Sequence, residues 1–433
     1  MDTEIKNESY YKELVNFSLL AGLILMASRA ETNRVEDTVS RILKTSGLPI
    51  TEAFVLPTGI TITLSDNKDM TICVNKRTAP GEVNINKIHE VNQVSRDFCS
   101  GVKNLEESYT RLKEINEEKS MPLWIKLIGS SLASGGFSVV FGGSVLDGVS
   151  SLIIGLILGL CLHYVKKILQ KDFLTIAICS FIVAFLGVLF PWVAIKLNIS
   201  ISPQYIISGC LMPLVPGVAI TNSVRDVLSG DFLSACARAV EAVMIAAAIA
   251  LGVSGGLYVS EIVGLSNSEM GFVLDINRGS LPLDILYGAI SIVIAVIGFI
   301  YLMEIPRKYI IQCCITGCMA WVCFIVFDYA EINTVWSTFL ATLVAELVSY
   351  IFARLYKAPV ITFLIAGIIP LVPGIYIYRA AYFFVIRSPL ASSALTDTIK
   401  LAAVIALGIL VMGTILQVIS REIKTINRKK NPK

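Results

Sequence analysis

The sequence Pro-Leu-Val-Pro-Gly occurs twice in this chain, and each copy lies inside a long apolar segment. The first copy runs from Pro213 to Gly217, and the second runs from Pro370 to Gly374. Each proline lacks a backbone N–H and pushes the residue before it out of the α conformation, so neither segment can form a continuous helix. Broken backbone at membrane depth is tolerated only where protein or a water-filled cavity satisfies its polar groups. The two copies therefore predict a pair of interrupted helices that face the protein interior.

The composition places these segments in a membrane protein. Of 433 residues, 55% are hydrophobic and only 16% are charged, whereas about 25% of the residues in soluble globular proteins are charged. We predict an α-helical polytopic membrane protein with about ten transmembrane helices, divided five and five around the polar loop 257–282. The expected spans are 123–143, 147–166, 172–196, 203–228, 231–256, 283–304, 308–327, 332–355, 360–387 and 396–419.

An odd number of spans in each half would turn the second half upside down relative to the first. One proline-containing segment is the fourth span of each half, so the two breaks would cross the membrane in opposite directions and meet near its midplane. Inverted repeats with broken helices at the midplane are typical of secondary transporters. We therefore expect one five-helix repeat at 121–260 and a second one at 261–433.

The first 120 residues predict a small α+β domain. Helices at 14–29 and 35–44 precede three short alternating segments at 51–56, 60–64 and 70–74. Turn residues separate these segments, as expected for antiparallel strands. Two more helices at 85–99 and 105–118 complete the expected domain.

The distribution of charge predicts the orientation. Lysine and arginine gather after the even-numbered spans and in the tail after residue 419, on the same side as the N-terminal domain. By the positive-inside rule, the domain and both termini are cytoplasmic. The net charge of +3 gives no reason to expect a nucleic-acid partner. No metal site or other cofactor is expected either, because the cysteine-rich segment 313–323 contains no histidine or acidic residue.

Each broken helix should restart after the glycine of its break, with the N–H groups of 218–220 and 375–377 directed at the gap. Helix N-termini carry partial positive charge and bind carboxylates. The carbonyls expected to be freed by the prolines, those of Gly209, Met212, Ala366 and Ile369, would accept an ammonium group or a cation. A small carboxylate-bearing substrate between the breaks is one hypothesis, and a simple packing kink is the alternative. The candidate binding residues are Pro213, Pro216, Gly217, Thr221, Asn222, Pro370, Pro373, Gly374, Tyr376, Tyr378 and Arg379.

Ionisable residues inside the expected spans are candidates for proton coupling, because charge in the hydrocarbon region is costly. Glu346 lies deep in the eighth span with no charged neighbour in its own turn. Arg238 and Glu241 lie three residues apart in the fifth span and can pair, and Asp226 precedes the turn that leads to it. Three other aspartates are expected to cap helices: Asp147, Asp231 and Asp397.

In the N-terminal domain, charged residues are concentrated between Glu31 and Asp37. Glu31 and Arg34 have the spacing of a helical ion pair, and Asn33 is a candidate cap for the second helix. An enzyme would use Glu36 with Asp37 as a general acid and base. The sequence offers no nucleophile or metal-ligand pattern to support that role, so a docking surface or a solvated face is the alternative. We assign no catalytic residue.

Taken together, these segments resemble the threonine/serine exporter family of bacterial transporters, in its fused single-chain form. The resemblance covers nearly the whole chain. Its motifs are Arg34-Val35-Glu36-Asp37-Thr38, Pro57-Thr58-Gly59, Val91-Asn92-Gln93-Val94-Ser95-Arg96, Phe141-Gly142-Gly143 with Asp147, both proline breaks, Asp226 and Arg238.

The resemblance implies a multi-pass protein of the bacterial inner membrane that exports small hydroxy amino acids by proton antiport. Its partners would then be the substrate, protons and the lipid bilayer, and a homo-oligomer is compatible with the sequence. A related form split over two chains is associated with succinate export, so a dicarboxylate exporter is the alternative. A membrane-anchored enzyme and a passive channel are the remaining possibilities.

Overall fold

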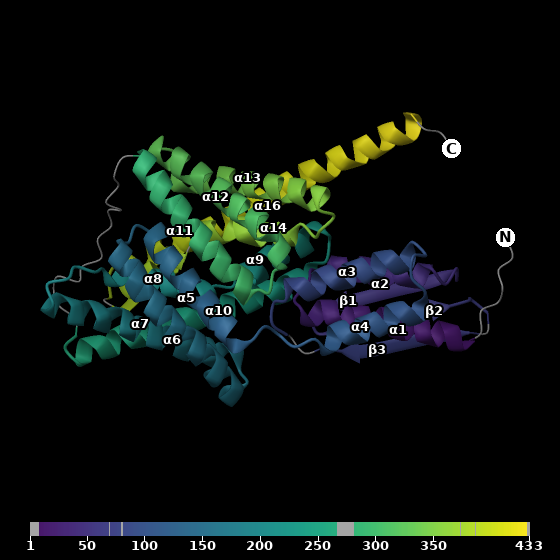
Figure 1. Ribbon diagram of the computed structural model, residues 1–433, viewed down its shortest axis with the longest axis horizontal. Helices are drawn as coiled ribbons and strands as arrows, with labels where there is room; N and C mark the ends of the chain where they lie inside the picture. The colour runs from purple at the N-terminus through teal and green to yellow at the C-terminus, as the bar shows by residue number, and fades with distance from the viewer. Residues whose placement is uncertain are drawn as a thin grey trace. The chain divides into compact units, whose positions relative to one another are not determined.

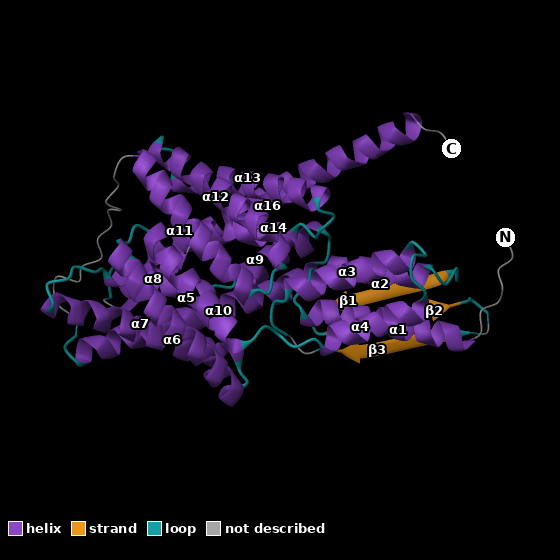
Figure 2. Ribbon diagram, viewed as in Figure 1, coloured by secondary structure: helices purple, strands orange, loops and turns teal. Residues whose placement is uncertain are grey.

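The computed structural model describes residues 8–68, 70–78, 81–265, 281–372, 374–385 and 387–430. Most of these residues are helical, and three strands form a small sheet (Figures 1 and 2). The chain divides into two compact units. The first contains the described part of Met1–Ser120 together with Asn222–Ala239 and Met303–Pro306. The second contains Met121–Thr221, Val240–Leu302 and Arg307–Lys433, again as far as these are described.

The sheet of the first unit is a three-stranded antiparallel meander in the order β1-β2-β3. Its strands are β1 (Ile50–Leu56), β2 (Gly59–Ser65) and β3 (Thr71–Arg77), drawn in orange in Figure 2. Alternate residues of β2 point to the core, and Ile60, Ile62 and Leu64 are fully buried there. The period-two pattern of the sequence thus gives one apolar face, as expected for a half-buried strand.

Four helices complete the N-terminal part of this unit: α1 (Glu8–Ala27), α2 (Thr32–Lys44), α3 (Ile85–Cys99) and α4 (Leu105–Glu117). Phe17 of α1 lies at the centre of the core, with its ring 4.9 Å from that of Phe98. Asn84 caps α3, and Asn104 forms a capping box with Glu107 at the start of α4. The predicted order of two helices, three strands and two helices is confirmed.

After residue 120 the chain consists of two halves, 123–262 and 281–430, which have the same order of elements. Each half has three long helices, a short helix, a 3₁₀ turn, a twelve-residue helix and a final long helix. The first set is α5 (Leu123–Val140), α6 (Val145–Leu169), α7 (Asp172–Lys196), α8 (Pro203–Leu211), η1 (Met212–Leu214), α9 (Gly217–Leu228) and α10 (Phe232–Ile262). The second set is α11 (Leu281–Leu302), α12 (Ile310–Tyr329), α13 (Thr334–Leu355), α14 (Ile361–Ile368), η3 (Ile369–Leu371), α15 (Gly374–Val385) and α16 (Ala391–Lys430), with η2 (Arg307–Tyr309) before α12.

The lengths of these helices suit a polytopic membrane protein. Among the described residues, eight helices are long and apolar enough to cross a membrane, and the bent pair Pro203–Leu214 with Gly217–Val227 would make a ninth. The ninth expected span, 360–387, falls on the short apolar helix Ile361–Leu371 and on α15. The predicted fold class is confirmed, while the inversion of one half relative to the other stays a prediction.

Helices α5 and α11, one from each half, approach each other through small residues. A Cβ atom added to Gly298 would lie 2.4 Å from the backbone nitrogen of Ala133. A Cβ atom added to Gly136 would lie 2.7 Å from the backbone nitrogen of Ala295. Small residues at such positions allow close backbone packing, which drives helix association where lipid supplies no hydrophobic force.

We expect Gly298→Leu to destabilise the protein, because the new side chain would overlap the backbone of α5. Overpacking of this kind costs about 1–3 kcal/mol, and the thermal unfolding midpoint of the purified protein in detergent measures it. Gly413→Ala is the control, because its new Cβ atom would lie 3.8 Å from the Glu346 carboxylate, at ordinary contact distance. An unchanged midpoint for Gly298→Leu would contradict the close packing of α5 and α11.

Candidate functional site

Both proline-containing segments interrupt their helices in the same way. In the first copy, α8 passes into the 3₁₀ turn η1, Val215 is extended with φ −66° and ψ 134°, and α9 begins at Gly217. The two parts of this span meet at an angle of 52°. In the second copy, Val372 is extended with φ −63° and ψ 133°, and α15 begins at Gly374. Pro373 lies outside the described residues.

The prediction that the prolines would leave free carbonyls is wrong for three of the four groups. The Gly209 carbonyl accepts from the Met212 N–H, and the Met212 carbonyl accepts from the Val215 N–H. In the second copy, the Ile369 carbonyl accepts from the Val372 N–H. The physical reason is that a 3₁₀ turn bonds residues three apart, so each turn uses groups that an α-helix would have left without a donor.

One expected free donor is also occupied, because the Ile220 N–H donates to the Pro216 carbonyl at 3.0 Å. In addition, the Gly217 N–H donates to the Val215 carbonyl at 2.8 Å. Two N–H groups at the start of α9 are thus already bonded to carbonyls of the same segment. This break is therefore a poorer anion site than the sequence suggested.

The two breaks pack against each other within the second unit. A Cβ atom added to Gly217 would lie 3.8 Å from Val372 in the opposite break. A Cβ atom added to Gly374 would lie 2.5 Å from the sulfur of Met212 and 3.7 Å from the ring of Phe141. The glycine of each break therefore lies against the partner break, and Gly374 has no room for a side chain unless Met212 moves.

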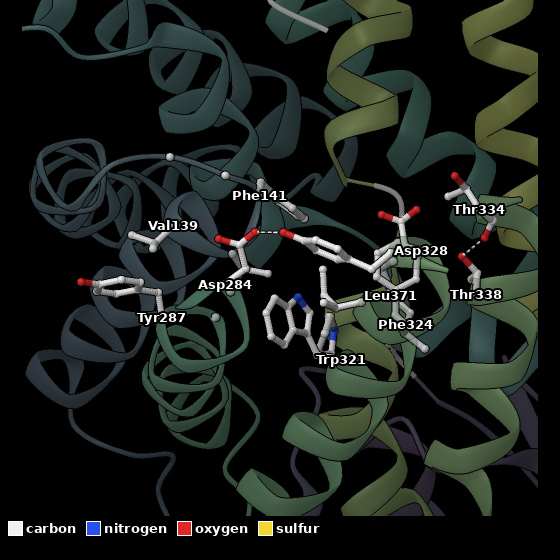
Figure 3. A pocket seen from close by; sticks show the side chains of 18 of the residues that line it. Val139, Phe141, Asp284, Tyr287, Trp321, Phe324, Asp328, Thr334, Thr338 and Leu371 are labelled. Carbon is white, nitrogen blue, oxygen red and sulfur yellow. Dashed lines mark hydrogen bonds between the residues drawn. The ribbon is translucent and has the colours of Figure 1, made fainter. Parts of the chain in front are cut away.

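A cavity of about 380 Å³ lies beside the second break (Figure 3). Its walls come from the turn between α5 and α6, from α11, α12, α13, α15 and α16, and from η3. The turn contributes the Phe141-Gly142-Gly143 motif, and Gly142 has a φ of 102°, which favours glycine. The polar side chains in the walls are Ser144, Asp284, Tyr287, Asp328, Tyr329, Thr334, Thr338 and Tyr376, and Trp321 and Phe324 are prominent among the apolar ones.

The cavity is acidic. Asp284 of α11 accepts a short hydrogen bond from the Tyr329 hydroxyl of α12, and Asp328 lies next to that tyrosine in the chain. Figure 3 shows Asp284 and Asp328 among the side chains around the cavity, together with Thr334 and Thr338. No lysine, arginine or histidine is among the described residues that line it. The cavity therefore suits a ligand with a positively charged group.

The sequence-predicted binding residues divide into three groups. Pro370 and Tyr376 line the cavity. Pro213, Pro216, Gly217 and Gly374 form the breaks. The rest lie elsewhere: the Thr221 hydroxyl donates to the Gly217 carbonyl of its own helix, Arg379 lies 5.6 Å from the Tyr376 ring centre, and the side chain of Tyr378 is outside the described residues.

Asn222, Asp226 and Arg238 belong to a different site, in the first unit. The end of α9, the turn after it and the start of α10 form a helical hairpin, here called the elbow (222–238). Side chains of the elbow bond every residue of the segment Arg29–Asn33, which joins α1 to α2. The contacts are Asn222 Nδ2 to the Arg29 carbonyl (2.9 Å), Arg238 Nη2 to the Ala30 carbonyl (2.7 Å), Arg225 Nη1 to the Glu31 carboxylate (3.1 Å), Thr32 Oγ1 to the Asp226 carboxylate (3.3 Å) and Asn33 Nδ2 to Ser229 Oγ (2.9 Å).

The charges of this site are paired and largely removed from solvent. Asp226 is fully buried and forms an ion pair with Arg238 at 2.9 Å. Burial would raise the pKa of Glu31, but the nearby Arg225, Arg34 and Arg238 outweigh it and hold that pKa below its ordinary value. The Glu31 carboxylate therefore stays ionised near neutral pH, and the site acts as an ion network that joins two distant parts of the chain.

The other predicted polar residues have structural positions. Glu346 of α13 is buried and lies beside Gly413 of α16, and Glu241 lies on α10. The caps at Asp147 and Asp231 are confirmed. The cap at Asp397 is wrong, because α16 begins earlier, at Ala391, and Asp397 pairs with Lys400 inside the helix. Asn33 is not a cap either, since α2 begins at Thr32.

The carboxylates of the cavity are not recognisable as site residues from the sequence alone. Asp284 begins the sixth expected span, and Asp328 follows the end of the seventh, so both resembled ordinary boundary residues. The available signal was the combination of an aspartate and a tyrosine, Asp328-Tyr329, directly after an apolar run. Asp284 and Asp328 lie around one cavity with the Phe141-Gly142-Gly143 motif because of the way the helices pack. That packing cannot be read from a single sequence.

Comparison with known proteins gives one consistent result. Residues 16–260 match the family described as "Putative threonine/serine exporter", and residues 288–415 match the family described as "Threonine/Serine exporter, ThrE". The chain is 22% identical over 382 residues to the "Threonine/serine exporter" of Corynebacterium glutamicum, which covers 88% of this chain and 77% of that protein. It is 20% identical over 415 residues to the "Probable threonine/serine exporter" of Mycobacterium tuberculosis, which covers 93% and 76%. No solved structure matches the chain.

The ion network predicts an acid-sensitive contact. Because the pKa of Glu31 is lower in the folded protein than in the unfolded chain, its carboxylate contributes stability above the unfolded pKa of about 4.3. This contribution is lost as the pH falls through the lower folded value. We expect the contribution of Glu31 to the protection of the α2 amides against hydrogen exchange, after correction for the intrinsic exchange rate, to be present at pH 7 and to be lost below about pH 4.

Glu31→Gln is the control for this prediction. It leaves Arg225 without its buried countercharge, so α2 should exchange faster at pH 7 and show a smaller change in acid. A wild-type profile and a Glu31→Gln profile that coincide at every pH would contradict the assigned role of Glu31.

Proposed function

We propose that this chain, which belongs to the threonine/serine exporter family, exports threonine and serine and binds them in the cavity beside the second break. At the coarser level, the family assignment identifies the chain as a multi-pass membrane transporter of amino acids, not as an enzyme. The observation that carries the finer proposal is the pairing of acidic side chains with a helix N-terminus around one cavity.

The acidic wall supplies a partner for the ammonium group of the substrate. Asp284 and Asp328 are both candidates, because both side chains line the cavity. A charge-assisted hydrogen bond between an ammonium and a carboxylate is worth about 1.5–3 kcal/mol. Trp321 offers an aromatic face beside the same space, which also favours a cation.

The start of α15 supplies a partner for the substrate carboxylate. Leu371, Val372 and Tyr376 line the cavity on either side of Gly374, where α15 begins. The Gly374 N–H donates to the Val372 carbonyl at 2.8 Å, as in the first break, so the proposed donors are the N–H groups of residues 375 and 376. The first N–H groups of a helix carry partial positive charge and bind carboxylates without a basic side chain. Thr334 and Thr338 add hydroxyl groups nearby, which suit the side-chain hydroxyl of threonine or serine.

Succinate fits the cavity less well than threonine does. A dicarboxylate would bring two negative charges next to Asp284 and Asp328, and the described lining residues include no basic side chain to neutralise them. Like charges in a site of low dielectric constant repel strongly. The acidic wall thus favours the amino acid over the dicarboxylate alternative.

The transport mechanism completes the proposal. The matching order of elements in the two halves supports an inverted repeat whose breaks cross near the midplane. The basic loops support an arrangement in the inner membrane with both termini in the cytoplasm. Glu346, a buried carboxylate on α13, supports proton antiport, because an acid at membrane depth can bind and release a proton during the cycle.

Asp328→Asn tests the substrate site. We expect a 10- to 100-fold loss of threonine efflux relative to the amount of inserted protein, because about 1.5–3 kcal/mol of ammonium binding is removed. Efflux of labelled threonine from preloaded cells measures it. Asp397→Asn is the matched control, since Asp397 is exposed and pairs with Lys400 on the surface of α16. The proposed substrate is wrong if the intact chain exports succinate but neither threonine nor serine.

Glu346→Gln tests proton coupling in vesicles. The variant should still exchange internal for external threonine but should lose accumulation driven by a pH gradient. Threonine efflux by the wild type should also respond to a protonophore, whereas a passive channel would follow the substrate gradient alone. If Glu346→Gln retains the full pH dependence, Glu346 is not the proton carrier, and Asp226 and Glu241 become the next candidates.

A further inference from the structure

The elbow (222–238) connects the N-terminal domain with the first break through a single helix. Its first residue, Asn222, lies on α9, and α9 begins at Gly217 inside the break. A twelve-residue helix is about 18 Å long, so one hydrogen-bonded element runs from the break to the elbow. The chain between the break and the elbow therefore contains no loop.

The segment Arg29–Asn33 holds that end of α9. It offers the elbow two backbone carbonyls, one carboxylate, one hydroxyl and one amide, and each of these groups is used. Arg29 has a φ of 61°, so the chain turns sharply where the segment begins. Five consecutive residues bonded by one hairpin form a specific docking contact rather than a general apolar surface.

A second contact attaches the same domain to the loop after α11. The Ile85 N–H donates to the Met303 carbonyl at 3.1 Å, and the Asn86 N–H donates to the Glu304 carbonyl at 2.9 Å. The Asn84 amide also donates to the Glu304 carboxylate at 2.7 Å. This contact is made largely by main-chain groups, whereas the contact at Arg29–Asn33 is made largely by charged and polar side chains of the elbow.

We propose that the segment Arg29–Asn33 is a releasable latch on the first broken helix. In the closed latch, the N-terminal domain fixes the end of α9 and thereby the first break. In each transport cycle the latch opens at the elbow, while the contact at Met303–Glu304 keeps the domain attached. The residues of the latch are positioning residues and do not contact the substrate. The link between latch opening and the transport cycle rests on the proposed function, whereas the contact between Arg29–Asn33 and the elbow does not.

The chemistry of the contact suits reversible opening. Taking Glu31, Asp226 and their arginines out of water costs several kcal/mol per ion, and mutual attraction roughly offsets that cost. When the latch opens, the same groups regain their hydration, so separation needs little net free energy. An apolar contact of equal size would lose its hydrophobic stabilisation on opening, with no hydration of charge to offset the loss.

A reversible cross-link tests whether the latch opens. Asn33 and Ser229 bond each other at an exposed place, so a short bifunctional thiol reagent should join the pair Asn33→Cys with Ser229→Cys. The exposed native cysteines Cys73, Cys99 and Cys236 are first changed to serine. We expect threonine efflux by the full-length protein to fall at least tenfold on cross-linking and to recover on reduction.

The matched control is a pair within one helix. Asp37 and Arg41 of α2 form an exposed ion pair, so Asp37→Cys with Arg41→Cys takes the same reagent without bridging to the elbow. This control should keep its efflux. If cross-linked Asn33→Cys/Ser229→Cys protein also transports at the full rate, the latch does not open and the proposal is wrong.

A second measurement tests the latch independently of any substrate. Thr32→Val keeps the shape of the side chain and removes the hydroxyl that contacts both Asp226 and Arg238. Hydrogen exchange of the α9 amides should become at least tenfold faster, while exchange in α13 stays the same. Thr38→Val, further along α2, is the control and should leave α9 unchanged. Unchanged α9 exchange in Thr32→Val would show that the segment does not position α9.

The two tests separate this inference from the proposed function. If the unmodified protein exports neither threonine nor serine, the proposed substrate fails, but the exchange of α9 still decides whether the latch holds the helix. If threonine export is confirmed and cross-linking has no effect, the function stands and the latch fails.

Discussion

The structure depends on satisfying the backbone polar groups of two interrupted membrane helices. A proline removes a donor and leaves a carbonyl without a partner, which lipid cannot supply. Here a 3₁₀ turn before each break uses most of these groups locally, and the two breaks pack against each other through Gly217, Val372, Gly374 and Met212. The main structural role of the breaks is therefore to pack against each other. The space left beside them, not the broken backbone alone, supplies the cavity with its acidic wall.

A second constraint is the desolvation of charge at the elbow. Asp226 and Arg238 are buried together, and neither would be stable there without the other. The backbone of Arg29 and Ala30 and the side chains of Glu31 and Thr32 complete the network. The same interactions that satisfy these charges also tie the N-terminal domain to the helix that leads to the first break. Specific polar chemistry thus joins residues 29–33 to the elbow within the first unit.

Much of the architecture follows directly from sequence patterns. The alternation in β2, the caps at Asp147 and Asp231 and the interruption after Met212 and Ile369 are local effects, so they are readable from a single chain. The position of Asp284 and Asp328 is different, because it depends on how α11 and α12 pack against a turn far away in the chain. Likewise, Asp226 and Arg238 were recognisable as costly charges, but their contacts with Thr32 and Ala30 join residues 194 and 208 positions apart. Local chemistry was predictable, and long-range pairing was not.

The central claim is that the acidic cavity beside the second break holds the substrate amino acid. An experimental structure of the full-length protein with saturating threonine tests it most directly. We expect threonine to occupy the cavity, with its ammonium group at Asp328 or Asp284 and its carboxylate towards the start of α15. Threonine bound elsewhere in the protein, with the cavity containing only water, would contradict the account.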